Sequence, residues 1–255
     1  MFELTDKTVL VTGASKGIGA AIVAGLGQAG ANVIAHYGSD AHGAREATSA
    51  IPSARVKLIG ADLAQKADVD RLWTEASGWK GRIDVLVNNA AVMRLKGGIE
   101  DEEAVWDEVW DEALKVNVLA PARLMRHAVR HYLSSGGGIL VTISSWAAQR
   151  GPGNPALLAY AASKGAVLAA TKAIARNYAK NNVLAYVVAP GVVRTRLSEQ
   201  AAAAAGGEAA FTAALTMGEW VPPDDIASLV TFLASGSCKH LSGATLDVNG
   251  ASYIR

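Results

Sequence analysis

Two side chains spaced four residues apart could carry acid–base chemistry. Tyr160 and Lys164 stand in the stretch Tyr-Ala-Ala-Ser-Lys. On a helix, residues i and i+4 lie on one face a turn apart, so this spacing would bring the ammonium beside the phenol. A neighbouring positive charge favours the phenolate and lowers a tyrosine pKa from about 10 towards working pH. Such a tyrosine can take a proton from an alcohol or give one to a carbonyl, although the same spacing also occurs on solvated helices.

A glycine-rich turn near the start of the sequence predicts a phosphate-binding site. A β-branched run over residues 8–12 leads directly into it, and an Ala-rich helical pattern over 20–29 follows. Glycines let the backbone approach a pyrophosphate, and a helix N-terminus supplies free N–H groups and the positive end of a dipole. The spacing, G-x-x-x-G-x-G, differs from the commonest dinucleotide fingerprint. We expect the dinucleotide to be held by Gly13, Ser15, Lys16, Gly17, Ile18 and Gly19.

The end of the next predicted strand indicates which cofactor is preferred. The strand over residues 32–35 runs into His36 and Tyr37, both of which are expected to contact the cofactor. An acidic residue at this point would bind the adenosine ribose of NAD, but Tyr37 stands there instead, and Lys16 can face the same ribose edge. The sequence therefore favours NADP(H), with NAD(H) as the alternative. After the third strand, Asp62 could bond the adenine or cap the following helix. The other cofactor contacts expected after the third and fourth strands are Leu63, Asn89, Ala90 and Ala91.

The composition excludes several classes of protein. Of 255 residues, 51% are hydrophobic and 18% are charged, which is typical of a globular chain rather than a disordered one. The net charge of +1 makes neither nucleic acid nor a membrane surface an expected partner. Cys238 is the single cysteine and the start of the chain carries no apolar signal segment, which together predict a cytoplasmic location. His127 and His131 lack further ligands in the sequence, so no metal site is expected.

Strand-like and helix-like segments alternate along the whole chain. This alternation predicts an α/β fold, a single doubly wound Rossmann-like domain over residues 1–255 with a mostly parallel seven-stranded sheet. The cofactor half is expected over about 1–117 and the catalytic and substrate half over about 118–255. Within the second half, an Ala- and Gly-rich stretch over about 196–218 is interpreted as a mobile lid. Strands are predicted over residues 8–12, 32–35, 56–60, 83–87, 138–143, 183–189 and 244–248.

Four motifs in one order carry a resemblance to a known family. They are TGASKGIG at 12–19, NNAA at 88–91, ISS at 143–145 and YAASK at 160–164. Between residues 7 and 250 the chain closely resembles the classical short-chain dehydrogenase/reductase family. The resemblance implies a Rossmann-like fold, a nicotinamide cofactor and an Asn-Ser-Tyr-Lys tetrad, here Asn117, Ser145, Tyr160 and Lys164. It also implies that a segment over the nicotinamide contains Pro190, Gly191, Val193 and Thr195.

The resemblance assigns a role to each member of the tetrad. Tyr160 exchanges the proton with the substrate oxygen, and Lys164 lowers the tyrosine pKa and holds the nicotinamide ribose. Ser145 hydrogen-bonds the reacting oxygen, and Asn117 fixes a water in a proton relay below Lys164. Hydride passes between the nicotinamide and the carbon that bears this oxygen. The stretch between Ser145 and Tyr160 is longer than is usual in the family, which leaves Ser144 as an alternative to Ser145.

Residues beside the tetrad are expected to line the substrate pocket. Trp146 and the leucines favour an apolar or ring-shaped substrate, whereas Arg94 or Arg150, unless they are surface arginines, could bind a carboxylate or phosphate. The predicted function is an NAD(P)-dependent oxidoreductase that interconverts a secondary alcohol and a ketone. The substrate classes left open are sugars or polyols, 3-oxoacyl compounds, and cyclic or aromatic carbonyl compounds. The pocket residues are Met93, Arg94, Trp146, Gln149, Arg150, Leu157, Val192 and Leu197.

Two further expectations concern the protein as a whole. A competing function is a catalytically silent dinucleotide-sensing binding protein of the same fold, against which the intact pair of Tyr160 and Lys164 argues. The helix predicted from Tyr160 to about Lys180 is rich in small residues, which permit the close approach of a second subunit. The enzyme is therefore expected to act on a small-molecule alcohol or ketone and to be a homo-oligomer, either a dimer or a tetramer.

Overall fold

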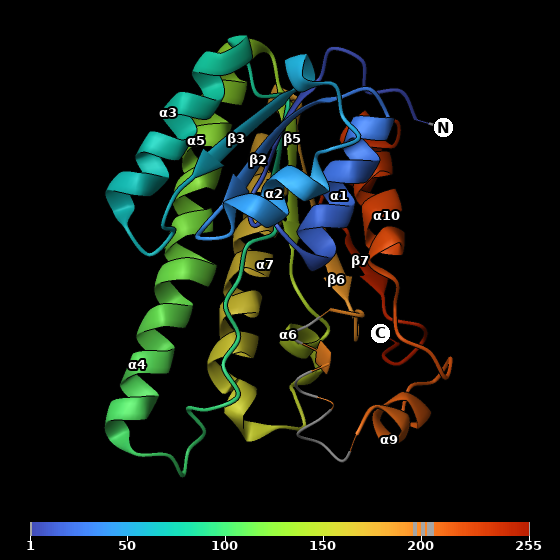
Figure 1. Cartoon of the computed structure of the whole chain (residues 1–255). Coiled ribbons are helices and arrows are strands. Elements are labelled where there is room, and N and C mark those ends of the chain that lie inside the picture. Colours follow the sequence, from blue (N-terminus) through green and yellow to red (C-terminus); the bar gives the residue numbers. More distant parts are fainter. Residues whose placement is uncertain (1, 196–197, 200–201, 203–206, 255) are drawn as a thin grey trace.

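The computed structural model describes residues 2–195, 198–199, 202 and 207–254. Its centre is one sheet of seven strands in the order β3-β2-β1-β4-β5-β6-β7, and every neighbouring pair is parallel. The predicted α/β fold is confirmed, with a sheet that is wholly parallel (Figure 1). The strands are β1 (Thr8–Val11), β2 (Asn32–Tyr37), β3 (Val56–Gly60), β4 (Val85–Asn88), β5 (Gly138–Ile143), β6 (Val183–Pro190) and β7 (Thr245–Val248).

Helices cover both faces of the sheet (Figure 1). Side chains of a strand alternate between the two faces. In β1, Val9 and Val11 pack into the core beneath α1 and α10, whereas Leu10 packs beneath α3, α5 and α7. Burial on both faces explains why the central strands β1, β4, β5 and β6 are mostly apolar. The described helices are α1 (Gly17–Gln28), α2 (Ala41–Ala47), α3 (Lys66–Lys80), α4 (Glu103–Leu114), α5 (Ala120–Ser135), α6 (Ala147–Arg150), α7 (Leu158–Tyr178), α9 (Glu208–Ala213) and α10 (Pro223–Ser235), with short helices η1 (Ser53–Arg55), η3 (Pro155–Leu157), η4 (Ala179–Asn181) and η5 (Lys239–Leu241).

A π-helical turn, η2 (Lys115–Leu119), joins α4 to α5. The sequence predicts a continuous helix with a kink at Pro121, and Pro121 lies in the first turn of α5. Proline has no N–H to donate to the carbonyl four residues earlier, so the regular ladder is interrupted at this point. The widened turn carries Asn117, whose amide reaches Ser163 on α7. The interruption thus contributes to the site.

Five strands, β1, β2, β4, β6 and β7, begin or end one or two residues away from the prediction, and the largest shifts are at the end of β2 and the start of β4. β2 continues to Tyr37 because this residue pairs with Gly60 of β3, so His36 and Tyr37 belong to the strand. β4 begins at Val85, since the Asp84 carboxylate accepts the Thr8 N–H at 2.9 Å just before the two strands pair. Both shifts leave the predicted number of strands and the site edge unchanged.

One helical stretch, Pro155–Asn181, is long and apolar enough to cross a bilayer by length and composition alone. Helices packed inside a protein pass the same test, and α7 within this stretch lies against β5 and β6. Only 28% of its most apolar window is buried within the chain. Much of the apolar surface of α7 therefore faces outwards.

Candidate active site

The predicted catalytic and cofactor residues meet at the edge of the sheet where the strands end. Parallel strands place their carboxyl ends on one edge, and the chain order reverses between β1 and β4. Ligands of open α/β sheets bind at such a point. The first turns of α1 and α7 begin at the same edge, after β1 and after the loop that follows β5. The glycine turn and the Tyr160 stretch are therefore brought together by the topology.

The glycine turn packs so closely that larger side chains would not fit. A Cβ atom on Gly13 would lie 2.9 Å from the Ala90 backbone, and one on Gly19 would lie 2.0 Å from the Gly13 carbonyl oxygen. Gly13 and Gly17 also have φ angles of 66° and 55°, which glycine adopts without strain. The turn is therefore a bare backbone cradle of the kind that accepts a pyrophosphate.

Thr12 and Asn89 hold this cradle against the end of β4. The Thr12 hydroxyl accepts the N–H groups of Asn89 at 3.0 Å and Ala90 at 3.1 Å. The Asn89 side chain donates to the carbonyls of Thr12 at 2.9 Å and Gly13 at 3.1 Å. Asn89 therefore positions the cradle with its side chain, while Ala90 and the exposed Ala91 lie beside it with no bulk.

The start of α1 offers N–H groups that no side chain caps. Lys16 is the N-cap residue, its side chain makes no capping hydrogen bond, and the first turn holds no acidic residue. Uncapped N–H groups and the positive end of the helix dipole attract an anion. Ile18 packs against the core, whereas Ser15 is partly exposed and Lys16 is exposed. These residues fit a dinucleotide diphosphate, with a cation at its outer edge.

His36 is turned into the fold, with 2% of its surface exposed. Its Nδ1 accepts the Gly13 N–H at 3.1 Å, which leaves the Nε2–H to donate to the Ala61 carbonyl at 3.0 Å. Both nitrogens bind backbone groups, so the His36 side chain positions the glycine turn. It is not free to contact the cofactor, which differs from the expectation from the sequence. Burial lowers the pKa of His36 and so keeps the neutral ring that this arrangement requires.

We expect His36→Phe to lower stability and to reduce its dependence on pH. The change leaves the Gly13 N–H and the Ala61 carbonyl unpaired, at a cost of about 1–3 kcal/mol for each group. Because the folded-state pKa lies below the ordinary value of 6.5, the unfolded chain takes up a proton that the folded chain does not. Stability therefore falls as the pH drops from about 6.5 towards the lower, folded-state pKa.

Urea unfolding between about pH 5.5 and 7.5 measures this effect. His42→Phe is the control, since His42 is exposed and its ring contacts only Glu46. A pH slope in His36→Phe equal to that of the parent chain would contradict the role given to His36.

The adenosine end of the site carries no acid at the end of β2. Asp40 instead accepts the Gly43 N–H at 2.8 Å and caps α2. Tyr37 is partly exposed beside Gly60. Asp62 accepts the Ala64 N–H at 2.9 Å, which shapes the turn before α3, although the N-cap residue of that helix is Gln65. The buried Leu63 follows Asp62 on the same turn.

The segment after β6 lies across the site from the glycine turn. The methyl group of Thr195 would be 3.1 Å from a Cβ atom on Gly17. The Pro190 carbonyl accepts the Trp146 N–H at 3.0 Å, so this segment is also tied to the loop after Ser145. This segment thus lies between the cradle and the catalytic stretch, and its Val193 is buried. It contains the predicted residues Pro190, Gly191, Val193 and Thr195.

Ser145 is the serine that faces the Tyr160 phenol. Its side chain lies near enough to the Tyr160 phenol to lower the pKa of that phenol, and its hydroxyl accepts the Ala147 N–H at 3.1 Å. Ser144 is buried and donates to the Lys164 carbonyl at 3.0 Å, which links the end of β5 to α7. Of the two serines left open by the sequence, the geometry favours Ser145.

Burial has the largest effect on the pKa of Tyr160 in this arrangement. It raises this pKa, and the neighbouring Ser145 side chain offsets part of the rise. The Lys164 Nζ donates to the Ile143 carbonyl at 2.8 Å and lies 5.8 Å from the centre of the Tyr160 ring. Burial lowers the pKa of Lys164 to about 8. The spacing predicted the neighbours correctly, but the ammonium binds a backbone oxygen rather than the phenol.

Asn117 reaches the catalytic helix through Ser163. Its Nδ2 donates to the Ser163 hydroxyl at 3.0 Å, and this hydroxyl donates to the Tyr160 carbonyl at 2.7 Å. The same amide binds both backbone groups of Val92, each at 2.8 Å. The side chain therefore aligns the Tyr160 turn with the segment after β4. Pro121, four residues after Asn117, has no N–H to donate to the Asn117 main-chain carbonyl.

Two polar side chains predicted to line the substrate pocket bind other residues instead. Arg94 donates to both carboxylate oxygens of Glu112, at 2.7 and 2.6 Å, an arrangement that uses its planar guanidinium fully. Gln149 on α6 donates to Asp247 on β7 at 2.7 Å. Neither side chain is therefore free to bind a substrate.

The remaining predicted pocket residues are largely apolar. The Arg150 guanidinium lies over the Trp146 ring, 4.5 Å from its centre, so Arg150 is occupied by a cation–π contact. Met93, Leu157 and Val192 are each partly exposed. Leu197 lies outside the described residues.

Several residues that shape the site were not predicted from the sequence. Thr12 and Ser163 lie inside the recognised motifs, and hydroxyls that follow a strand or sit within a helix often bond nearby backbone, so both could have been found. Glu112 and Asp247 had no such signal, because their partners are distant in the sequence.

Comparison with known proteins places these features in a common context. The sequence model of a family described as "Enoyl-(Acyl carrier protein) reductase" matches residues 13–251. The chain is 33% identical to 3beta-hydroxysteroid dehydrogenase 1 of Eggerthella lenta, over 99% of this chain and 95% of the relative. It is 29% identical to 2-dehydro-3-deoxy-D-gluconate 5-dehydrogenase of Escherichia coli (strain K12), over 100% of this chain and 98% of the relative.

The fold has a close counterpart among solved structures. A short chain dehydrogenase from Burkholderia cenocepacia, in complex with NADP, superposes with a TM-score of 0.87 and 30% sequence identity. The match covers 98% of this chain and 99% of that chain. The similarity therefore extends over the whole sheet and both halves of the site edge.

Proposed function

The chain belongs to the short-chain dehydrogenase/reductase family of oxidoreductases, and on that premise we propose that it interconverts a secondary alcohol and a ketone, with Tyr160 as the general acid and base. The observation that carries the proposal is the pair formed by the Tyr160 phenol and the Ser145 side chain beside it. This pair lies at the sheet edge that also holds the glycine cradle. Proton transfer to the substrate oxygen and hydride transfer to its carbon can therefore take place in one site.

Ser145 and Tyr160 together manage the substrate oxygen. A bound nicotinamide cofactor supplies or accepts the hydride. In the reductive direction the Tyr160 hydroxyl gives its proton to the carbonyl oxygen, while the Ser145 hydroxyl donates a hydrogen bond to the same oxygen and stabilises the negative charge that develops. The raised pKa of Tyr160 keeps the phenol protonated, which is the form that reduction needs.

Lys164 and Asn117 are proposed to return the proton to Tyr160. The Lys164 ammonium lies behind the Tyr160 ring, and its pKa of about 8 makes proton exchange near neutral pH accessible. A water on the main-chain carbonyl of Asn117 would connect Lys164 to solvent. Lys164 would also hold the ribose of the nicotinamide.

The preference for NADP(H) is proposed from Lys16 and from the absence of an acid at the end of β2. We expect Lys16→Ala to weaken NADPH binding roughly five- to tenfold and to leave NADH binding nearly unchanged, because an ammonium binds a 2′-phosphate more strongly than a hydroxyl. Fluorescence titration with both cofactors measures the two affinities. Lys172→Ala, at an exposed position on α7, is the control, and an unaltered NADPH affinity in Lys16→Ala would refute this assignment.

The paired arginines support a neutral, largely apolar substrate. Arg94 is held by Glu112, and Arg150 lies on Trp146. Arg194, after β6, binds Glu208 at 2.9 Å. None of these three cations is free to bind a carboxylate or phosphate on the substrate. By their names, the two relatives act on a hydroxysteroid and on a sugar acid, and the pairing favours substrates of the first kind: cyclic or aromatic ketones and the corresponding alcohols.

The test is a substrate panel followed by the absorbance of the reduced cofactor. Neutral ring ketones are compared with keto acids and 3-oxoacyl thioesters, with NADPH and with NADH. We expect kcat/KM to be at least about tenfold higher for the ring ketones, a difference of roughly 1.4 kcal/mol. A preference for the acids would refute the substrate class. Tight NADPH binding without turnover of any compound would refute the enzyme and support a dinucleotide sensor, which the dehydrogenase relatives do not favour.

Two other expectations are kept as proposals. The stretch over about 196–218 is proposed to close over the substrate. In the described part of this stretch, the Thr212 hydroxyl accepts the indole N–H of Trp220 at 2.6 Å, and Phe211 packs on the Trp220 ring. Trp220 follows the stretch and anchors α9. A cytoplasmic location is proposed from the single cysteine.

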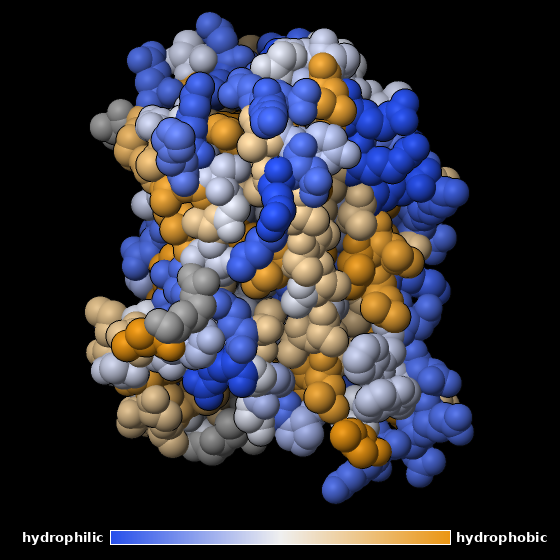
Figure 2. Space-filling model, turned by 180° about the vertical axis from the view of Figure 1, so that it is seen from behind, coloured by the Kyte–Doolittle hydropathy of each residue, from blue (hydrophilic) through white to orange (hydrophobic). Residues whose placement is uncertain are grey.

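The outer face of α7 supports assembly with a second copy of the chain. Figure 2 shows hydrophobic side chains gathered down the middle of the face behind the sheet. Along α7, the alanines at 162, 166, 169 and 173 are exposed, and this spacing places them in one stripe. Exposed leucines flank it on the helix that runs from α4 to α5, with 43% of Leu114 and 63% of Leu119 exposed. Small residues let two helices approach closely, so we propose a dimer or tetramer built on this face.

We expect Ala166→Arg to dissociate this assembly, since a long charged side chain would be buried in the middle of the stripe. Size-exclusion chromatography with light scattering gives the mass of the parent chain and of the variant. Ala50→Arg is the control, because Ala50 is exposed away from α7. A parent chain that is already monomeric at micromolar concentration, or an Ala166→Arg variant of unchanged mass, would contradict the proposal.

A further inference from the structure

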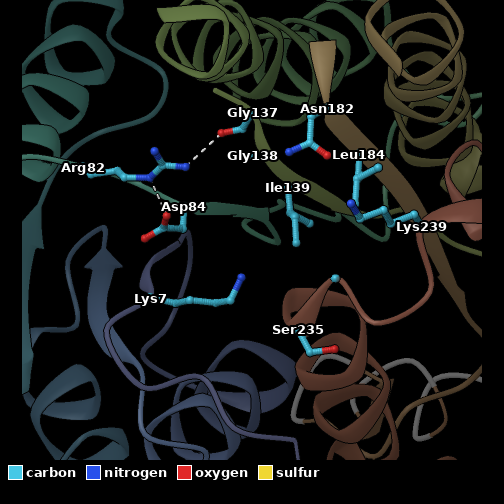
Figure 3. A pocket seen from close by; sticks show the side chains of 11 residues that line it. Lys7, Arg82, Asp84, Gly137, Gly138, Ile139, Asn182, Leu184, Ser235 and Lys239 are labelled. Carbon is cyan, nitrogen blue, oxygen red and sulfur yellow. Dashed lines mark hydrogen bonds and ion pairs between the residues drawn. The ribbon is translucent and has the colours of Figure 1, made fainter. Parts of the chain in front are cut away.

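A cavity of about 180 Å³ lies at the opposite edge of the sheet from the candidate active site. It is formed where β4, β5 and β6 begin and where α10 ends, just before β1 (Figure 3). A cavity of this size has room for a molecule about as large as benzene. The catalytic and cofactor residues follow the carboxyl ends of the same strands, so this is a separate site. It is lined by Lys7, Arg82, Asp84, Gly137, Gly138, Ile139, Asn182, Leu184, Ser235, Gly236 and Lys239.

The charged side chains of the lining are mostly cationic. Lys7, Arg82 and Lys239 face a single acidic residue, Asp84. Figure 3 shows the ammonium groups of Lys7 and Lys239 approaching the hollow from two sides, one from the segment before β1 and the other from η5. The cavity therefore has an excess of positive charge, which is concentrated between the side chains of Lys7 and Lys239.

Asp84 is not available to neutralise the two lysines. It accepts the Arg82 Nε–H at 2.5 Å and the Thr8 N–H at 2.9 Å. Arg82 also donates to the carbonyls of Ser135 at 2.6 Å and Gly137 at 3.1 Å. The ion pair of Arg82 and Asp84 and its hydrogen bonds to the backbone thus link the starts of β1, β4 and β5.

The lysines are also not needed to satisfy the helix ends near the cavity. α5 and α10 both end here, and carbonyls at helix C-termini attract cations. Arg82 and the Asn182 amide, which donates to the Gly136 carbonyl at 3.2 Å, already serve the end of α5. At the end of α10 the Ser235 hydroxyl donates to the Phe232 carbonyl at 2.6 Å. Within the described chain, the ammonium group of neither lysine makes a hydrogen bond or an ion pair.

We propose that this cavity binds a small dianion of the phosphate type between Lys7 and Lys239. Two ammonium groups act as separate point charges with rotatable donors, which suits the oxygens of a tetrahedral anion. A hollow lined by one sign of charge concentrates counter-ions. A bound anion would join the segment before β1 to η5 after α10, so it would stabilise the fold by mass action. Because the catalytic residues lie at the other edge, turnover would be unchanged at saturating cofactor.

The test uses calorimetric titration and thermal unfolding of the full chain at constant ionic strength, with saturating NADPH present. One arm adds inorganic phosphate and the other adds glycerol 1-phosphate, which separates a free anion from a phosphoryl group carried by a metabolite. Lys7→Gln/Lys239→Gln is compared with Lys80→Gln/Lys172→Gln, which removes two exposed lysines that do not line the cavity.

We expect saturable binding of at least one of the two anions, a higher unfolding temperature on binding, and at least tenfold weaker binding in Lys7→Gln/Lys239→Gln than in the control variant. Unfolding without anion shows whether the double variant is folded, and Lys239→Gln alone, at an exposed residue, gives the same comparison if it is not. Absence of saturable binding in the parent chain, or equal affinity in both double variants, would overturn the proposal.

Discussion

Replacing Tyr160 by phenylalanine is expected to lower kcat by about 10²–10⁴-fold, the usual contribution of a positioned general acid. Phenylalanine keeps the ring that packs beside Lys164 but removes the hydroxyl that lies beside Ser145. The substrate oxygen would then lose its proton donor and keep only the Ser145 hydroxyl. Because this interaction is needed in the transition state, kcat and kcat/KM should fall together.

Tyr178→Phe is the matched control for this change. Tyr178 lies on the same helix, is partly buried, and packs against the core, while its hydroxyl makes no hydrogen bond within the described residues. Its loss should leave kcat unchanged. NADPH titration and thermal unfolding of both variants separate chemistry from binding and folding. Turnover by Tyr160→Phe at the rate of the parent chain would refute the mechanism proposed for Tyr160.

The parts of the site that could be predicted are those set by the local chain. The glycine turn follows β1 directly, and its spacing alone indicates a backbone that must approach another group closely, as Gly13 and Gly19 do. The parallel sheet follows from the alternation of strands and helices, because parallel strands require a crossover between them. The resemblance to the family predicts that Asn117, Ser145 and Tyr160 share one site. In the structure, Asn117 reaches Ser163 on the helix that carries Tyr160, and Ser145 lies beside the phenol.

The position of the Lys164 ammonium could not be predicted from the local sequence. Helical spacing determines the relation between the backbone of Tyr160 and that of Lys164. The Nζ stands at the end of four rotatable bonds, however, and it is directed by the nearest strong acceptor, the Ile143 carbonyl. That acceptor lies at the end of β5, and only the packing of α7 on the sheet brings it close. The effect of Lys164 on the tyrosine pKa was therefore not readable from the spacing.

The substrate pocket was the least predictable part for a related reason. Whether an arginine or a glutamine is free depends on partners far away in the sequence. Gln149 is bound by Asp247, and Arg150 reaches the Ser252 carbonyl at 3.4 Å, so the C-terminal residues decide how α6 presents its side chains. No local pattern marks such pairs. Specificity therefore depends on long-range contacts, while the chemistry depends on local motifs.

Gly19→Ala is expected to weaken NADPH binding by at least about tenfold, or roughly 1.4 kcal/mol, and to destabilise the fold by about 1–3 kcal/mol. The added Cβ atom would stand 2.0 Å from the Gly13 carbonyl oxygen and 2.7 Å from the Asn89 amide. The oxygen belongs to the cradle itself and the amide holds it in place, so relief of the clash must displace the backbone that would bind the pyrophosphate. The usual preference of helices for alanine, about 1 kcal/mol, is too small to offset this displacement.

Gly78→Ala is the control that isolates the clash from the helix preference. Gly78 lies in α3, and a Cβ atom there would meet nothing within 4 Å, so the change should raise stability by about 0.5–1 kcal/mol and leave NADPH affinity as it is. Urea unfolding and NADPH titration are carried out on both variants. If the cradle is as tight as its geometry indicates, Gly19→Ala lowers the free energy of unfolding and the NADPH affinity, whereas Gly78→Ala raises the free energy of unfolding. Equal gains in stability with full cofactor affinity would mean that the turn yields without cost, and the glycine cradle could then no longer be assigned to the dinucleotide.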